Sequence, residues 1–163
     1  MDAESFGSRG GAETRRDALK DIDEISGDVL DASLQLHRDL GPGLLESVYE
    51  VILAGMLSER GYRVDRQKPI DIDYRGLRFD AAFRIDLLVD ERLIVEIKSV
   101  ERLTAAHSKQ LLTYLRLTQQ PVGLLINFAG ATLKEGVHRI VNNHCPSASP
   151  RLRVNQNKEN HDV

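Results

Sequence analysis

The hydrophobic period of the sequence changes from that of a helix to that of a strand at Gly61, and this change constrains the fold more than any other feature. Before Gly61, apolar residues recur every three or four positions, as in amphipathic helices. They are Ile22, Ile25, Val29, Ala32, Leu36 and Leu40 in a first run, and Leu45, Val48, Tyr49, Ile52, Met56 and Leu57 in a second. Because Gly41-Pro42-Gly43 interrupts the two runs, we expect an N-terminal helical hairpin.

After Gly61 the pattern predicts three strands, at 63–74, 77–89 and 93–100, with turns at Arg75-Gly76 and at 90–92. We expect Thr104 to cap a helix that runs to about Thr118. The apolar run at 122–128 then suits a buried strand, reached from the third strand by a parallel crossover. The expected fold class is α/β, with a mixed β-sheet flanked by helices.

Composition limits the domain organisation and the cellular setting. With 163 residues, of which 41% are hydrophobic, the chain can bury one core. We expect one domain at 17–145 between disordered polar tails at 1–16 and 146–163. A single cysteine, Cys145, excludes an internal disulfide, and no Cys/His cluster has zinc spacing. No apolar run is long enough to cross a bilayer, so we expect a cytoplasmic protein without membrane contacts.

Two acids and one lysine lie in strands that are otherwise apolar. Glu96 and Lys98 are two residues apart and therefore project from the same strand face. If 90–92 form a hairpin loop, Asp86 lies opposite Glu96 on the neighbouring strand. Facing carboxylates repel unless a cation or a shared proton lies between them. Oxygen ligands alone favour Mg²⁺ or Mn²⁺. The alternative is that both acids are ordinary strand charges, paired with Arg84 and Lys98.

The segment GLLESVYE at 43–50 carries a family resemblance. With Gly43, Glu46 and Tyr49, it resembles the motif of the GxxExxY proteins, a group of the PD-(D/E)XK nuclease superfamily. The likeness extends over roughly residues 22 to 141, and several motifs in the right order are more specific than any one of them. It implies a restriction-endonuclease-like core, although Ile85 stands where the superfamily name has proline.

This resemblance implies a role for each candidate residue. Asp86 is similar to the central metal-binding aspartate, Glu96 and Lys98 look like the E-x-K pair, and Glu46 resembles the acid of the first helix. The metal would be held by Asp86, Glu96, the Ile97 carbonyl and Glu46. We expect Lys98 either to orient or deprotonate the attacking water, or to stabilise the charge that develops at phosphorus.

Further residues are expected to support the reaction or to contact the substrate. Gln110 and Tyr114 resemble the Gln-x-x-x-Tyr motif, and His107 shares their helix face. Arg84 belongs to a basic stretch at 60–84 that carries seven Arg or Lys residues against four Asp. The stretch either follows a phosphate backbone or is a solvated strand face. For His107, a capping role is the alternative to a substrate contact.

The sequence therefore predicts a metal-dependent nuclease that hydrolyses DNA. A net charge of −3 argues against binding by bulk electrostatics, so any phosphate-binding surface must be local. Two alternatives stay open. One is a catalytically silent member of the fold that binds nucleic acid or protein, and the other is a nuclease that acts on RNA. Both a monomer and a homodimer are compatible with the sequence.

Overall fold

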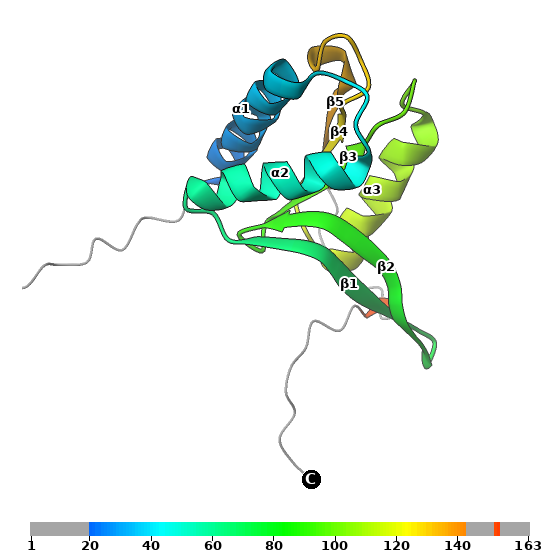
Figure 1. The fold of residues 1–163 in the computed structure, drawn as a ribbon. Coiled ribbons are helices and arrows are strands. Elements are labelled where there is room, and N and C mark those ends of the chain that lie inside the picture. Colours follow the sequence, from blue (N-terminus) through cyan, green and yellow to red (C-terminus); the bar gives the residue numbers. More distant parts are fainter. Residues whose placement is uncertain (1–19, 143–151, 154–163) are drawn as a thin grey trace, which may run out of the picture.

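A six-stranded mixed sheet lies at the centre of the computed structural model, which describes residues 20–142 and 152–153 (Figure 1). The helices are α1 (Ile22–Leu40), α2 (Glu46–Glu59) and α3 (Ala105–Thr118), with a 3₁₀ helix η1 (Lys134–Gly136). The strands are β1 (Val64–Tyr74), β2 (Leu77–Val89), β3 (Leu93–Lys98), β4 (Val122–Asn127), β5 (Val137–Val141) and β6 (Leu152–Arg153). Their order is β5-β4-β3-β2-β1-β6, and only β3 and β4 are parallel. The predicted α/β class is confirmed.

The predicted N-terminal helical hairpin is also confirmed. Asp21 caps α1 by accepting hydrogen bonds from the backbone N–H groups of Asp23 and Glu24, which satisfies amides that have no partner inside the helix. Gly41 ends the helix with a φ of 68°, a conformation that glycine adopts without strain. Both α1 and α2 pack on the same face of the sheet, whereas α3 covers the other face (Figure 1).

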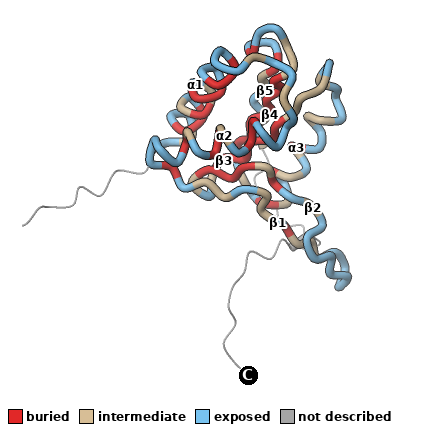
Figure 2. The backbone as a smooth tube through the Cα atoms, in the orientation of Figure 1, coloured by how far each residue is buried: buried red, intermediate tan, exposed pale blue. Residues whose placement is uncertain are grey.

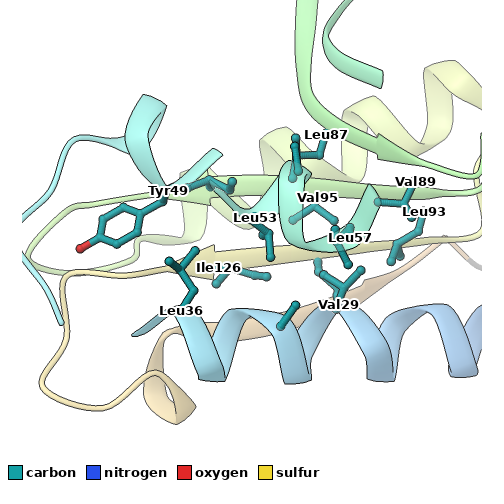
Figure 3. Packing of buried hydrophobic residues seen from close by; sticks show 14 of the residues in the cluster. Val29, Leu36, Tyr49, Leu53, Leu57, Leu87, Val89, Leu93, Val95 and Ile126 are labelled. Atoms are coloured by element: carbon teal, nitrogen blue, oxygen red, sulfur yellow. The ribbon is translucent and has the colours of Figure 1, made fainter. Parts of the chain in front are cut away.

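The larger core lies between the sheet and the two N-terminal helices. Figure 3 shows Val29 and Leu36 of α1 and Leu53 of α2 pointing towards apolar residues of the central strands, and Figure 2 shows burial concentrated in the same region. Burying these side chains supplies most of the driving force for the fold. In the smaller core, under α3, Leu111 packs closely over Gly123, because a Cβ there would lie 2.9 Å from Leu111 Cδ1 and would displace that side chain.

Tyr49 fixes the start of α2 against the end of β4. Its ring stacks on Phe128 with 4.3 Å between the ring centroids. Its hydroxyl donates to the Gly41 carbonyl at 2.7 Å and accepts from the Leu44 N–H at 3.2 Å. These contacts hold the interhelical loop and the first turn of α2, which carries Glu46.

The β1–β2 hairpin extends beyond the body of the domain, where the first half of β2 is exposed and the second half of β1 is mostly half-buried (Figures 1 and 2). Its turn is the predicted Arg75-Gly76, with φ values of 53° and 81°, and a type I′ hairpin turn requires a positive φ at both positions. The strand register shifts between Ile70 and Ile72. The proximal half keeps its pairing with β3 and so belongs to the site described below.

The structure also differs from the sequence-based prediction at several boundaries. β1 begins one residue later than predicted, and β3 ends at Lys98 rather than at residue 100, because the Val100 N–H binds the Asn127 side chain at 3.0 Å. η1 and β5 were not predicted. Leu152–Arg153, inside the predicted C-terminal tail, form β6. The predicted tail at 1–16 and the rest of 146–163 lie outside the described residues. No helix in the described part of the chain is long and apolar enough to span a membrane.

Candidate active site

Two neighbouring strands bring Asp86 and Glu96 to the same part of the sheet. The β2–β3 hairpin has the predicted register, with Val89 opposite Leu93. Backbone pairing between the strands stops one position before the two acids. The Asp86 carboxylate instead makes the next contact across the hairpin, because its Oδ2 accepts a hydrogen bond from the Ile97 N–H at 2.9 Å. Asp86 is therefore held against β3 by its side chain.

Glu96 is a buried carboxylate with only one of its two oxygens hydrogen-bonded among the described residues. The residue is 5% exposed. Its Oε1 lies 2.7 Å from Lys98 Nζ, whereas its Oε2 is buried and has no hydrogen-bond partner in residues 20–142 and 152–153. Burial, and next the negative charge of Asp86, raise the pKa of Glu96 from 4.5 to about 7, against the opposing effect of Lys98. The site thus favours either a proton or another cation on this side chain.

Stability should consequently depend on pH through Glu96. The folded protein binds this proton more tightly than the unfolded chain does, so the stabilisation is complete below about pH 4.5 and is lost as the pH rises to about 7. For the ion-free protein, we expect the free energy of unfolding of the wild type, relative to Glu96→Gln, to fall by about 3 kcal/mol across this interval. Urea unfolding of both proteins from pH 4 to 8 measures the difference. A difference that does not change with pH would show that folding leaves the pKa of Glu96 unchanged.

Asp86 is held by neutral donors rather than by the basic partner that the alternative interpretation required. Its Oδ1 accepts from the Gln67 amide at 3.1 Å, and its Oδ2 accepts from Ile97. Burial raises the pKa of Asp86, and these hydrogen bonds and the charge of Lys98 oppose the rise. Arg84 is exposed and donates to the Gln67 carbonyl at 3.4 Å. Of the two ion pairs considered from the sequence, only the one between Glu96 and Lys98 is present.

Lys98 is a cation in this site. Burial alone would lower the pKa of its amine, but the hydrogen bond that the amine donates to Glu96 and the charges of Glu96, Asp86 and Glu46 outweigh burial, so the net pKa is raised. Its side chain is 16% exposed. Between the two roles expected from the sequence, this direction favours stabilisation of negative charge over removal of a proton from water.

Glu46 lies at the edge of the same cluster. Its Oε1 accepts a hydrogen bond from the Ser99 N–H at 3.0 Å, just after the end of β3. Its charge raises the pKa of both Glu96 and Lys98, so it acts on the same site. The side chain is exposed and lines an open groove of about 770 Å³, together with residues 42–45, Ser47, Ser99 and Ala129. Asp86 and Glu96 do not line this groove.

The α3 residues differ in how closely they approach the acids. Tyr114 is half-buried, its ring stacks on Phe83 at 4.0 Å, and its pKa is raised by burial and then by the charge of Glu96. The side chain of Gln110, an exposed residue, opposes this rise in the pKa of Tyr114. His107 Nδ1 accepts from the Thr104 N–H at 3.1 Å, so the capping interaction is present. A substrate contact by His107 stays a prediction.

The basic stretch at 60–84 is mostly neutralised within the protein. Arg63, Arg66, Lys68 and Arg78 each form an ion pair with an acid. Arg84 forms none in the described part of the chain. These contacts favour the solvated strand face over a continuous phosphate-binding surface, and they leave Arg84 as the candidate cation near Gln67.

Two residues of this neighbourhood were missed in the sequence. Glu50 is 5% exposed and accepts hydrogen bonds from Arg66 Nε at 2.9 Å and from Gln67 Nε2 at 2.7 Å. Its charge raises the pKa of Asp86. The available signal was its position one helical turn after Glu46, on the same helix face. The sequence gives no indication that Gln67 belongs to the site, because its role depends on a backbone conformation that strand periodicity does not reveal.

The acids are close enough to affect one another, yet each is bound to its own protein donor. Glu46 accepts a hydrogen bond from the Ser99 N–H, and Asp86 accepts from the Ile97 N–H and the Gln67 amide. Glu96 accepts from the Lys98 amine. Within residues 20–142 and 152–153, no group of three or more His, Cys, Asp or Glu side chains is arranged to hold a metal ion. The geometry therefore provides a coupled pair of carboxylates, with a third acid at its edge.

Comparisons with known proteins identify the superfamily of this chain. A model of the PD-(D/E)XK nuclease superfamily matches residues 23–140, a span that contains every candidate site residue. No curated protein and no solved structure matches the chain. The match is at the level of the superfamily, and the narrower resemblance to GxxExxY proteins stays a prediction. Because the family model covers most of the chain and the fold has the expected mixed sheet and helices, the protein belongs to the PD-(D/E)XK nuclease superfamily.

Proposed function

We propose that this protein is a metal-dependent nuclease that hydrolyses DNA phosphodiester bonds, with Asp86, Glu96 and Lys98 at the centre of its site. The observation that carries the proposal is the buried Glu96 Oε2, which has no hydrogen-bond partner among the described residues. A buried carboxylate oxygen without a partner is costly, and a ligand that binds there removes the cost. The raised pKa values of Asp86 and Glu96 support the proposal, because burial disfavours the charged form of each carboxylate unless positive charge lies nearby.

The available donors fit a hard divalent cation such as Mg²⁺ or Mn²⁺. Two carboxylates lie next to each other, and no sulfur or imidazole is among the proposed ligands. The Ile97 N–H points to Asp86, and the Ile97 carbonyl faces the same side, since the N–H and C=O of one residue in an extended strand point the same way. Asp86, Glu96 and the Ile97 carbonyl would hold the ion, with Glu46 acting directly or through water.

Each group in the proposed site would have its own role in the reaction. When bound, a divalent ion polarises a phosphate oxygen and lowers the pKa of a coordinated water. Lys98 supplies a fixed positive charge next to Glu96, where it would stabilise the negative charge that develops during displacement. Gln110, with Tyr114, would orient the substrate from α3. The groove beside Glu46 offers space for a nucleic-acid strand.

The test is cleavage of linear, circular and branched DNA by the wild-type protein with Mg²⁺ or Mn²⁺, with a matched RNA in parallel. We expect DNA products that disappear with EDTA and return when excess Mg²⁺ is added, because the chemistry depends on the ion. Products from RNA alone would instead support an RNA-directed nuclease. Binding of either nucleic acid without cleavage, under all these conditions, would support the catalytically silent alternative.

A further inference from the structure

We infer that Gln67 is a positioning residue, which orients the Asp86 carboxylate by connecting it to Glu50. The inference rests on the proposed function, because orientation of Asp86 matters to a reaction only if Asp86 takes part in one. Gln67 lies on β1, Glu50 on α2 and Asp86 on β2. A single side chain thus joins three elements at the site.

The contact geometry is that of a bridge. Gln67 Nε2 lies 2.7 Å from Glu50 Oε2 and 3.1 Å from Asp86 Oδ1. A side-chain amide nitrogen carries two hydrogens, so it can donate to both carboxylates at once. Glu50 is itself fixed, because its side chain is 6% exposed and its Oε1 accepts from Arg66 Nε. The bridge therefore connects Asp86 to an anchored group.

The backbone of Gln67 is adapted to this contact. Its φ is 48°, a conformation that is unfavourable for a residue with a Cβ and that persists only where the surroundings hold it. The regular pairing of β1 with β2 includes Arg66 with Leu87 and Lys68 with Ile85, but it omits Gln67 and Asp86 between them. β1 and β2 therefore lack one backbone pair at the position where the side chains of Gln67 and Asp86 meet.

The bridge fixes the orientation of the carboxylate and still leaves room for a ligand. Oδ1 is held by Gln67 and Oδ2 by the Ile97 N–H, so both oxygens of Asp86 are constrained. Each carboxylate oxygen has a second lone pair, which remains for another donor or a cation. Because Gln67 is neutral, it orients Asp86 without neutralising the negative charge that a cation would require.

The test compares Gln67→Asn with Gln119→Asn in the full chain. Asparagine tolerates a positive φ but is one methylene shorter, so at position 67 its amide cannot span both carboxylates. Gln119 is the matched control, because it is exposed and has a φ of 57° at the end of α3. The first measurement is hydrogen exchange of the Ile97 amide in the ion-free protein, with the Val100 amide, bound to Asn127 Oδ1, as an internal reference.

In Gln67→Asn, we expect the Ile97 amide to exchange about tenfold faster while the Val100 amide is unchanged, because only Asp86 has lost its support. We also expect kcat for DNA cleavage to fall by about 10- to 100-fold with little change in KM, as is usual when a hydrogen-bonded partner of a metal ligand is lost. Gln119→Asn should change neither quantity.

Three results would overturn the inference. The first is unchanged Ile97 exchange in Gln67→Asn. The second is faster exchange of both amides together with a lower free energy of unfolding, which would assign Gln67 a purely structural role. The third is faster Ile97 exchange with unchanged kcat. If the wild type cuts no nucleic acid, the proposed function fails, and the exchange of Ile97 still decides whether Gln67 orients Asp86.

Discussion

Glu96→Gln is expected to reduce metal-dependent cleavage by about 10³-fold or more while leaving the protein folded, because the substitution removes a metal-binding charge and conserves the shape of the side chain. The buried carboxylate costs stability when it is ionised, and its pKa is raised to about 7. The variant should therefore be more stable than the wild type at pH 8 without an ion. Cleavage rates at saturating Mg²⁺ and urea unfolding measure the two effects.

The opposite changes in activity and stability make this variant informative. A misfolded protein would lose both, whereas removal of an ionised buried ligand lowers activity and raises stability. Glu135→Gln is a suitable control, because Glu135 is an exposed acid on η1 and outside the candidate site. Cleavage at wild-type rates by Glu96→Gln would contradict the proposed role of Glu96.

Lys98→Ala is expected to lower kcat by about 10²- to 10³-fold, the range observed when one preorganised donor to a transition state is removed. Nζ lies 2.7 Å from Glu96 Oε1, and the raised pKa of Lys98 means that the positive charge is present at neutral pH. Unlike Glu96→Gln, this variant should also be less stable at pH 8. It removes the partner of Oε1 and leaves both oxygens of a buried carboxylate unbonded, which costs about 1–3 kcal/mol.

Addition of Mn²⁺ separates the two functions of Lys98. If the amine acts on the reaction, the ion should restore part of the stability of Lys98→Ala but little of its kcat. The control is Lys134→Ala, an exposed lysine on η1, for which no change is expected. Loss of stability without loss of kcat would show that Lys98 is an ordinary strand charge that pairs with Glu96.

Sequence patterns predicted the parts of the fold that depend on neighbouring residues. The period of apolar residues predicted α1 at its observed bounds, and Arg75-Gly76 predicted the turn that begins β2. The two-residue spacing of Glu96 and Lys98 placed both on one strand face, and in the structure Lys98 Nζ lies 2.7 Å from Glu96 Oε1. Helix and strand periods, turn chemistry and hairpin register are set within a few residues, so the sequence reveals them directly.

Other features depend on which distant segments meet. In the sequence, Glu50 resembles any other polar helix residue. In the structure α2 packs against β1, and there Arg66 and Gln67 bind the Glu50 carboxylate. The sequence left two roles open for Lys98, and only the structure places the acids that raise its pKa against the effect of burial. The edge strand β5 also pairs with β4 across a long connection and has weak periodicity of its own. Burial and pKa depend on three-dimensional neighbours, which spacing along the chain does not specify.

By itself, therefore, the sequence predicted α1, α2, α3 and the strands β1 to β4 in their chain order, and it indicated the three residues that we propose for the centre of the site. Only the tertiary structure decided that one oxygen of Glu96 is buried without a partner in the described residues, and that Gln67 connects Asp86 to Glu50. The physical reason is that local periodicity follows from backbone geometry, whereas desolvation and hydrogen bonding of a carboxylate are created by packing between α2, β1, β2 and β3.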